Sequence, residues 1–549
     1  MKELILKHVL INALEHNGKA DLQAVIGKVI AEDNSIKLKI KELIPAIKKT
    51  VEEINALNTK SQRQKLDELG AVIKPPEIKE EGLPELPNAK LRNVVLRLAP
   101  FPSGPLHIGN ARMVILNDEY AKMYKGKLLL VFDDTIGSGE KFILPEAYKL
   151  IEDGLKWLKV KYSKKFYKSD RLPIFYKIAG QLIKKNVAYV CKCDVETLRK
   201  NRAEGIACVH RNTPVNKTLV EWKSMLKGKY KEGEVVLRLK TNIQHPNPAF
   251  RDRVLFRVAE RPHPRVGKKF KVWPMLEFSW AIDDHMLGIT HIIRGKDLVI
   301  EDMMEEFIWN IMGWEPPEIL HYGFFNLGDV KLSKTEGRRS IEKKIYFGWD
   351  DPRTWSMQSL AKRGIQDRAI RNFILKMGLS MADVAVPEEI LYSENRKLID
   401  GKANRYFCVT DPVMISVRNA KLQTAEALLH PDFSKRGKRK IPVNLNKIYI
   451  ERNDFENLHD NEVGLMNLFS VMLKKNSELT SKDVKYEIQK IHWVSDPNVK
   501  IKIIMPNGKE FNALAEPSIK KLKNGSIVQF PRLGFARLDK NMIFFFAHK

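Results

Sequence analysis

His107 lies in a turn rich in proline and glycine, between a predicted strand and a predicted helix. The apolar run at 94–98 favours the strand, and the segment from Ala111 to Gly126 favours the helix because its interior lacks proline and glycine. Such a turn brings an imidazole and backbone N–H groups to the positive end of a helix, where a phosphate binds well. A lone histidine at such a position is more often an ordinary turn residue, so the assignment depends on a second motif.

Two lysines, Lys331 and Lys334, stand in a second loop far along the chain, in the segment KLSKT. The loop follows a strand-like stretch and offers two cations to a polyphosphate. A histidine at a helix start and a distant lysine loop suit phosphate chemistry by positioning and electrostatic stabilisation, without a protein nucleophile.

The element after the predicted helix is a second apolar run, at 128–132, which ends in Asp133. Strand, helix and strand at this spacing predict a βαβ unit in a parallel sheet. Both polar ends then lie at the carboxyl edge of that sheet, the usual place for a ligand in such folds.

A second group of reactive side chains consists of Cys191, Cys193, Cys208 and His210. Three of the four cysteines in the chain thus fall within 18 residues, beside a histidine. Four such ligands suit a closed, tetrahedral, structural Zn²⁺ site. The gaps of one residue are tighter than the commoner two-residue spacing, so a set of free thiols in a small insertion is the alternative.

The chain is strongly basic, with 95 Lys and Arg against 67 Asp and Glu in 549 residues, a net charge of +28. This excess predicts a polyanionic partner whose binding weakens as salt rises. Four cysteines exclude a disulfide scaffold and favour a reducing compartment. The sequence shows neither a signal-peptide core nor an apolar stretch long enough to span a bilayer, so we expect a cytoplasmic protein without membrane contact.

The motifs together resemble those of class I aminoacyl-tRNA synthetases, because HIGN (107–110) is similar to their HIGH signature and KLSKT (331–335) to their KMSKS signature. The segments RLAPFPSGPLHIGN, FDDT, AIDDHMLGITHIIRGKD and GWDDPRTWSMQSLAKRGI resemble the glutamyl/glutaminyl branch, in particular archaeal-type glutamyl-tRNA synthetases. The resemblance implies ATP-dependent ligation of L-glutamate to tRNA(Glu) through a glutamyl-adenylate, with release of AMP and pyrophosphate. It also implies a monomer, and tRNA(Gln) as a further candidate acceptor.

The resemblance also assigns roles to individual residues. It implies ATP with Mg²⁺, and four catalytic residues: His107, Asn110, Lys331 and Lys334. The ATP-binding residues would come from the two motifs and their edges. They are Pro105, His107, Gly109 and Asn110 in the first and Lys331, Ser333 and Lys334 in the second. The amino acid would be held by Arg97 and Arg294, whose planar guanidinium groups match a carboxylate, and by Asp133, which would meet the ammonium group.

Several positions depart from the family pattern around the amino acid: Phe101, Ile136, Trp273, Leu276 and Glu277. The ATP motifs are retained, whereas the amino acid pocket is less standard, so a glutaminyl-tRNA synthetase is the nearest alternative. A non-catalytic tRNA-binding paralogue is an alternative of another class, and retention of His107, Lys334 and Arg97 argues against it.

For the fold we expect a multidomain α/β + α + β protein with a Rossmann-type parallel-sheet catalytic domain, an inserted acceptor-binding subdomain, a helical stem-contact domain and C-terminal β-barrels. The expected segments are 1–72 (helical N-terminal module), 73–90 (linker), 91–190 (catalytic domain, first half), 191–272 (inserted acceptor-end subdomain with the zinc site), 273–340 (catalytic domain, second half), 341–400 (helical stem-contact domain) and 401–549 (anticodon-binding β-barrels). Basic residues in the last segment are predicted to bind tRNA phosphates: Lys435, Arg436, Lys438, Arg439 and Lys440.

Overall fold

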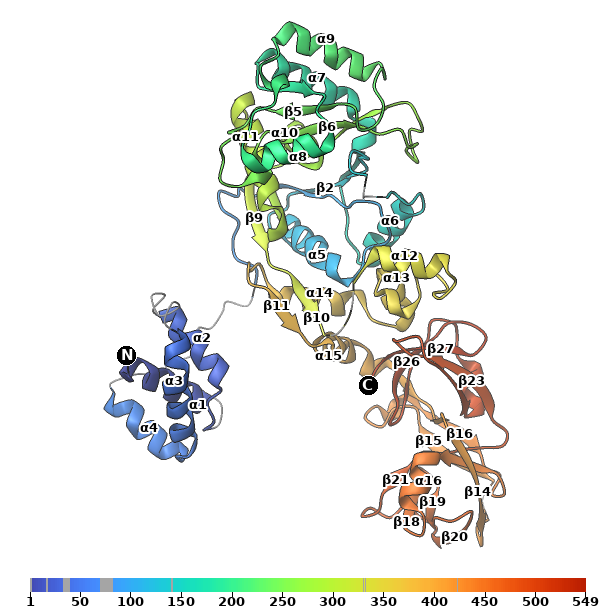
Figure 1. Cartoon of the computed structure of the whole chain (residues 1–549). Helices are drawn as coiled ribbons and strands as arrows, with labels where there is room; N and C mark the ends of the chain where they lie inside the picture. The colour runs from blue at the N-terminus through green and yellow to red at the C-terminus, as the bar shows by residue number, and fades with distance from the viewer. Residues whose placement is uncertain are drawn as a thin grey trace. The chain divides into compact units, whose positions relative to one another are not determined.

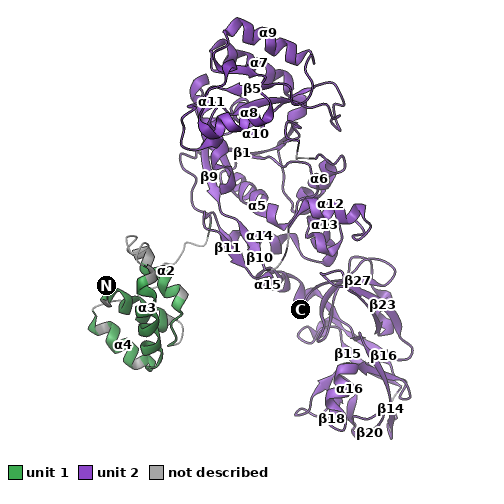
Figure 2. Cartoon of the chain, viewed as in Figure 1, with its two compact units in different colours: residues 1–82 green, residues 83–549 purple. Residues whose placement is uncertain are grey.

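The computed structural model describes residues 2–15, 18–32, 40–69, 82–139, 142–328, 330, 332–421 and 423–549. The chain divides into two compact units, residues 1–82 and 83–549 (Figure 2). Most of the predicted linker, residues 73–81, lies outside the described residues, and so does Lys331. No helix in the described part of the chain is long and apolar enough to cross a membrane.

The first unit is helical, as its apolar periodicity predicts. Its helices are α1 (Lys2–Glu15), α2 (Leu22–Glu32), α3 (Ile40–Asn55) and α4 (Thr59–Glu68). Side chains at helical spacing, such as Val9, Val25 and Ile47, are fully buried in one apolar core. Its charge is nearly balanced, since residues 1–82 hold 14 Lys and Arg against 13 Asp and Glu, whereas residues 83–549 hold 81 against 54.

A parallel sheet forms the first part of the second unit (Figure 1). Its strands β1 (Val95–Leu98), β2 (Lys127–Phe132) and β3 (Lys164–Tyr167) pair in this order, and α5 (Ile108–Met123) connects the first two. Leu128, Leu130 and Phe132 pack into one core and Leu129 and Val131 into another, so β2 is buried on both faces. The predicted βαβ unit is confirmed.

A second parallel pair of strands, from much later in the chain, lies beside β1. β8 (His291–Gly295) and β9 (Glu318–Tyr322) pair in parallel, and the backbone N–H of Thr290, next to β8, donates to the carbonyl of Val95 at 3.0 Å. The connecting helices are α6 (Ala147–Trp157), α10 (Leu276–Met286) and α11 (Val299–Met312).

An antiparallel sheet is inserted between the two halves of the parallel one. Its strands, in spatial order, are β4 (Ala188–Cys191), β5 (Val236–Leu239), β6 (Val254–Val258) and β7 (Val272–Pro274). The helices of this region are α7 (Leu172–Lys184), α8 (Val195–Glu204) and α9 (Val215–Leu226).

The region after the parallel sheet is mainly helical, with α12 (Lys334–Glu342), α13 (Met357–Arg363), α14 (Asp367–Met377) and α15 (Glu388–Ile399). The purely helical pattern expected for 341–400 is interrupted by β11 (Val384–Val386), which pairs in parallel with β10 (Phe325–Leu327). Three residues are too few for a strand to be recognised by periodicity alone.

The C-terminal part is built from β-strands, as its short runs and turn signals predict. One seven-stranded sheet contains, in spatial order, β12 (Asn404–Arg405), β25 (Ile527–Phe530), β26 (Gly534–Leu538), β27 (Ile543–His548), β23 (Val499–Ile504), β24 (Glu510–Ala515) and β13 (Cys408–Val409). A second contains β21 (Lys490–Ile491), β18 (Glu462–Leu465), β19 (Phe469–Met472), β20 (Asn476–Ser481), β14 (Pro412–Arg418), β17 (Ile448–Glu451) and β22 (Val494–Ser495). A two-stranded pair, β15 (Thr424–Leu428) and β16 (Lys438–Pro442), and one helix, α16 (Arg452–Leu458), accompany them.

Candidate active site and metal centre

His107 is the N-cap of α5 and forms a reciprocal cap with Asn110. Its Nδ1 accepts a hydrogen bond from the Gly109 N–H at 3.1 Å, and Asn110 Oδ1 accepts one from the His107 N–H at 3.2 Å. Burial, together with the positive charge of Lys334, lowers the pKa of His107 to about 3, so the ring is neutral at pH 7. Because Nδ1 is an acceptor, the proton of the neutral ring sits on Nε2.

The first N–H groups of α5 are bonded within the chain, which corrects the expectation that they face a phosphate. The Ile108 N–H donates to the Trp355 carbonyl at 3.0 Å, and the Asn110 N–H donates to the His107 carbonyl at 2.8 Å. The Gly109 N–H is held by the His107 ring. The features of this turn that can still attract a phosphate are the Nε2–H of His107 and the positive end of the helix.

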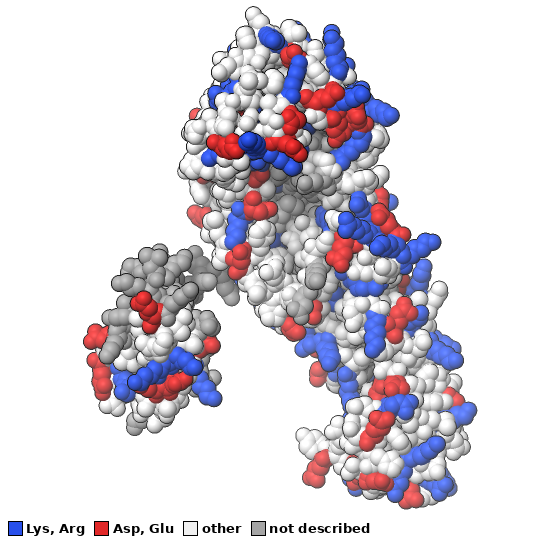
Figure 3. All heavy atoms as spheres, viewed as in Figure 1, with Lys and Arg blue, Asp and Glu red and all other residues white. Residues whose placement is uncertain are grey.

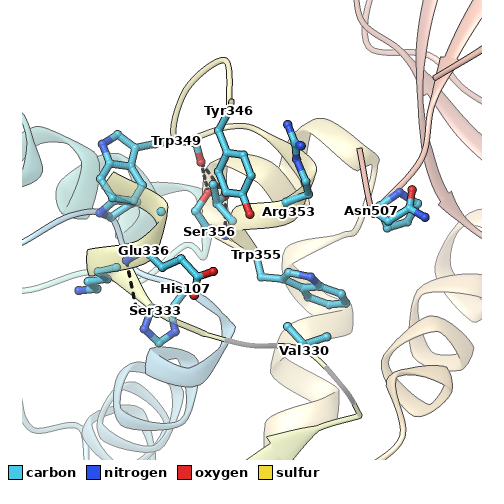
Figure 4. A pocket seen from close by; sticks show the side chains of 15 residues that line it. His107, Val330, Ser333, Glu336, Tyr346, Trp349, Arg353, Trp355, Ser356 and Asn507 are labelled. Atoms are coloured by element: carbon cyan, nitrogen blue, oxygen red, sulfur yellow. Dashed lines mark hydrogen bonds between the residues drawn. The ribbon is translucent and has the colours of Figure 1, made fainter. Parts of the chain in front are cut away.

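The lysine loop lies next to this turn, so the structure brings the two predicted motifs together. A pocket of about 330 Å³ is lined by Pro105 and His107 from the turn and by Ser333 and Lys334 from the loop (Figure 4). A Cβ atom at Gly109 would lie 3.1 Å from Cδ1 of Leu332. Glycine at this position therefore allows the two motifs to approach closely.

Lys334 is the first residue of α12, and Ser333 is its N-cap. The Ser333 hydroxyl accepts a hydrogen bond from the Glu336 N–H at 3.2 Å. Burial lowers the pKa of Lys334 to about 8, well below the usual value for lysine. The cation is thus held where water solvates it poorly, and a bound polyphosphate would stabilise its charged form.

The far wall of the pocket comes from the segment GWDDPRTWSMQSLAKRGI and from a turn of the C-terminal region. Trp355 and Arg353 line it, together with Asn507 from the turn between β23 and β24 (Figure 4). The Arg353 guanidinium stacks on the Tyr346 ring at 4.2 Å and is held by Asp351 through Nη2 and Oδ2 at 2.8 Å. This wall links the ATP motifs to the C-terminal β-rich region.

Arg97, on β1, is buried and already has a carboxylate partner. Both Nε and Nη2 donate to Asp284 on α10, the second at 2.7 Å. Arg294, on β8, donates from Nη1 and Nη2 to Glu305 at 2.9 and 3.0 Å and also contacts Asp302. Burial raises the pKa of Glu305 to about 7. The two predicted substrate arginines are therefore paired internally.

The indole of Trp280 contacts two of the predicted amino-acid-binding residues directly and the third through Lys168. Arg97 and Arg294 lie 4.4 and 5.3 Å from the ring centroid, and Lys168 lies 4.9 Å from it. The same Lys168 forms an ion pair with Asp133 at 3.1 Å. Around the indole, cation–π attraction and buried ion pairs thus hold three cations in one small volume.

A separate cavity of about 170 Å³ lies beside Asp133. Phe101, Leu276 and Glu277, which depart from the family pattern, line it. Arg253 lines it as well and donates to Glu277 and, at 2.9 Å, to Glu301. Sequence reasoning missed Arg253, Lys168 and Trp280, because their importance depends on partners far away in sequence.

The four predicted metal ligands converge in the inserted region; we call them the Cys/His cluster (Cys191, Cys193, Cys208 and His210). Their ligand atoms all lie within 4.8 Å of one another. The Sγ atoms of Cys191 and Cys208 are 3.7 Å apart, and His210 Nδ1 lies 3.5 Å from Cys193 Sγ and 4.0 Å from Cys191 Sγ. Tetrahedral zinc with ordinary bond lengths places two sulfur ligands about 3.8 Å apart. The donor set and its spacing fit zinc.

The basic residues predicted for tRNA lie on and before β16, but they differ in exposure. Arg439 is buried and pairs with Glu516 at 2.8 Å, and Arg436 donates to the carbonyls of Gly401 and Lys402 at 2.7 and 2.6 Å. The lysines of the group are exposed: Lys435, Lys438 and Lys440. Lys438 forms an exposed ion pair with Glu426 at 3.5 Å.

The sequence matches one family along most of its length. Residues 93–400 match the family described as tRNA synthetases class I (E and Q), catalytic domain, and residues 403–491 and 490–539 match two anti-codon binding domains of the same family. The glutamate–tRNA ligases of Pyrococcus horikoshii and Pyrococcus furiosus are 43% and 42% identical to this chain over 100% of both chains. That of Methanocaldococcus jannaschii is 39% identical over 98% of both. With the two nucleotide-binding motifs meeting at one pocket, and with relatives of this similarity over its whole length, the chain belongs to the E and Q family of class I tRNA synthetases.

Proposed function

We propose that this chain is a glutamate–tRNA ligase that activates L-glutamate with ATP and transfers it to tRNA(Glu), acting as a cytoplasmic monomer. The observation that carries the proposal is the pocket in which His107 and Lys334 meet, in a chain 43% identical over its length to a ligase of that name. tRNA(Gln) is a second candidate acceptor, since the same motifs serve both.

The first step is attack of a glutamate carboxylate oxygen on the α-phosphorus of ATP, with cleavage of the bond to pyrophosphate. The Nε2–H of neutral His107 donates to the phosphate chain. The charge of Lys334, supported by Lys331, stabilises the departing pyrophosphate. Mg²⁺ held by the phosphates of ATP would supply further neutralisation of their charge. Asn110 acts indirectly, because its side chain holds the backbone of His107.

The amino acid is proposed to bind beside Trp280, where Arg97 and Arg294 lie over the indole and Asp133 is paired with Lys168. Both arginines are buried, and a guanidinium forms strong paired hydrogen bonds with a carboxylate. The substrate must share these groups with Asp284 and Glu305. In the second step the terminal hydroxyl of tRNA attacks the activated carbonyl, and AMP leaves.

Zinc is the proposed occupant of the Cys/His cluster. The site is closed by four protein ligands and would stabilise the inserted region rather than take part in the reaction. Metal analysis of protein purified without added metal is expected to give about one zinc per chain, lost in a Cys191→Ser/Cys193→Ser double variant. Metal-free protein with full activity would exclude the proposal.

Attraction of tRNA is proposed to come from residues 83–549, which carry nearly all of the net positive charge. On the face seen in Figure 3, basic side chains are spread among acidic ones rather than gathered in one patch. Phosphate contacts at many points would supply most of the affinity, and base contacts the choice of tRNA. The exposed lysines Lys435, Lys438 and Lys440 are proposed as one such contact.

Aminoacylation with glutamate and with glutamine, each against purified tRNA(Glu) and tRNA(Gln), tests the proposal. Charging of tRNA(Glu) with glutamate is the expected result. Charging with glutamine alone would identify a glutaminyl-tRNA synthetase instead. Tight tRNA binding with no charging and no adenylate under any combination would identify a non-catalytic paralogue.

A further inference from the structure

Arg238 is a buried arginine whose guanidinium faces sulfur instead of a carboxylate. It lies on β5 with 1% of its surface exposed. Its Nη1 is 3.7 Å from Cys208 Sγ and 3.9 Å from Cys191 Sγ, and its Nε donates to the backbone carbonyl of Asp252 at 2.8 Å. Nη2 is buried without a hydrogen-bond partner among the described residues.

The strand register explains this placement. β4 and β5 are antiparallel, with Tyr189 opposite Arg238, so these two side chains and that of Cys191 lie on one face of the pair. The nearby Asp252 carboxylate is occupied elsewhere, because it accepts from Arg211 at 2.8 Å and from the Tyr189 hydroxyl at 2.9 Å. Within the described part of the chain, no carboxylate forms an ion pair with Arg238.

A guanidinium is always charged, and a buried charge is costly unless an opposite charge compensates it. Three thiolates and one neutral imidazole around a divalent ion carry a net charge of −1. Adding the guanidinium brings the assembly to zero. The buried guanidinium and the buried metal site therefore each supply the charge that compensates the other.

We propose that Arg238 is the positioning and charge-compensating residue of the metal site, and this proposal rests on zinc being the occupant of the Cys/His cluster. Arg238 holds two of the sulfur ligands from outside the coordination sphere and neutralises the site. The balance also selects a divalent ion, because a monovalent ion with the same ligands would leave the buried assembly negative.

The experiment uses the full chain and measures zinc affinity by competition with a chromophoric zinc chelator. Arg238→Met removes the charge at similar length, Arg238→Gln keeps hydrogen-bond donors without the charge, and Arg238→Lys keeps the charge. We expect Arg238→Met and Arg238→Gln to bind zinc about 10- to 100-fold more weakly than the wild type, as for loss of an outer partner of a metal ligand. Arg238→Lys is expected to recover most of the affinity.

Arg363→Met is the matched control, because Arg363 is equally buried but donates to the Ala547 carbonyl and the Tyr392 hydroxyl, away from the cluster. It is expected to lower thermal stability and leave zinc affinity unchanged. Wild-type protein that binds no zinc would refute the metal proposal itself. Wild-type protein that binds zinc, with Arg238→Gln or Arg238→Met binding equally well, would refute the role of Arg238 alone. If the methionine variant does not fold, the glutamine variant decides the question.

Discussion

Nη2 of Arg97 lies 2.7 Å from Oδ2 of Asp284, and Nε of the same guanidinium contacts the other carboxylate oxygen. The group proposed to bind the substrate carboxylate is thus already engaged by a carboxylate of the protein, with both partners buried. Glutamate must either displace Asp284 or bind to the edge of the guanidinium that remains. The pair therefore sets both the orientation of Arg97 and the free-energy cost of substrate binding.

Asp284→Asn tests this competition. Loss of the charge removes the only carboxylate that is hydrogen-bonded to buried Arg97 among the described residues, so we expect the free energy of unfolding to fall by about 3–5 kcal/mol. Glutamate restores the missing carboxylate and should raise the melting temperature of this variant more than that of the wild type, measured by calorimetry. Asp351→Asn, which breaks the ion pair of another buried aspartate with the partly exposed Arg353, is the control and should show no enhanced response to glutamate. Equal shifts in the wild type and in Asp284→Asn would mean that glutamate does not reach Arg97.

Lys334 predicts a pH dependence of ATP binding. Its pKa of about 8 means that the cation is present below pH 8 and is lost as pH rises through this value. Bound polyphosphate favours the charged form, so ATP affinity should fall as pH rises above 8, and binding at pH 8 to 9 should take up protons. Calorimetry in two buffers of different ionisation enthalpy measures this uptake. Lys334→Arg stays charged, and its affinity should be flat over the same range; a similar slope in both proteins would contradict the assignment.

His107→Ala should slow adenylate formation about 10²-fold, as expected for loss of one hydrogen-bond donor to the transition state. The wild-type rate should show no inflection between pH 5 and 7 from this ring, because its pKa of about 3 keeps it neutral there. Single-turnover measurements with saturating tRNA report the step directly. His107→Gln can accept from the Gly109 N–H and still donate, so it should retain more activity than alanine. A His107→Ala rate equal to that of the wild type, in folded protein, would remove His107 from the site.

Gly508→Ala should raise the ATP concentration needed for half-maximal rate. The residue has φ of 83°, and a Cβ atom there would lie 2.7 Å from Nε of Arg353, which lines the ATP pocket. Gly525→Ala is the matched control, because its φ of 88° carries the same backbone cost while the nearest atom, of Arg537, would be 3.5 Å away. Steady-state ATP kinetics of the two variants give the comparison. An equal effect on KM in both would trace the change to backbone strain instead of to Arg353.

Replacing Lys435, Lys438 and Lys440 together by alanine should weaken tRNA binding and flatten its salt dependence. Each lost phosphate contact reduces the slope of log affinity against log salt by about 0.7–0.9. The control removes the same charge from the nearly neutral first unit, at the exposed residues Lys48, Lys49 and Lys65. Filter binding at two salt concentrations distinguishes the two triple variants. Identical slopes would show that the three lysines do not contact tRNA.

How far the sequence predicts the site depends on how local each interaction is. Proline, glycine and helix signals are local and place His107 at the start of a helix, whereas the side-chain cap that it forms with Asn110, three positions further on, is not among the predictions. The ion pair of Arg97 joins residues 187 positions apart, and no local pattern marks Asp284 as its partner. The run of charges predicts that Arg439 contacts tRNA, yet alternation along β16 turns this side chain inward while its neighbours face solvent. A run of like charges in the sequence does not show which side chains are exposed. The alternation of side chains along the strand decides which of them can reach a ligand.

The turn at Pro506 and Asn507 lines the pocket beside His107, although it belongs to the C-terminal region. The C-terminal region therefore cannot be replaced without changing this pocket. A catalytic fragment ending near Ile399 would keep both nucleotide motifs but lack one wall of the pocket. It would also leave Arg363 without the carbonyl acceptors of Phe546 and Ala547. A chimaera that grafts a foreign anticodon-binding region onto this core must therefore supply the same turn and the same carbonyls. Engineering of new tRNA specificity should treat the turn between β23 and β24 as part of the nucleotide site and leave it with the core.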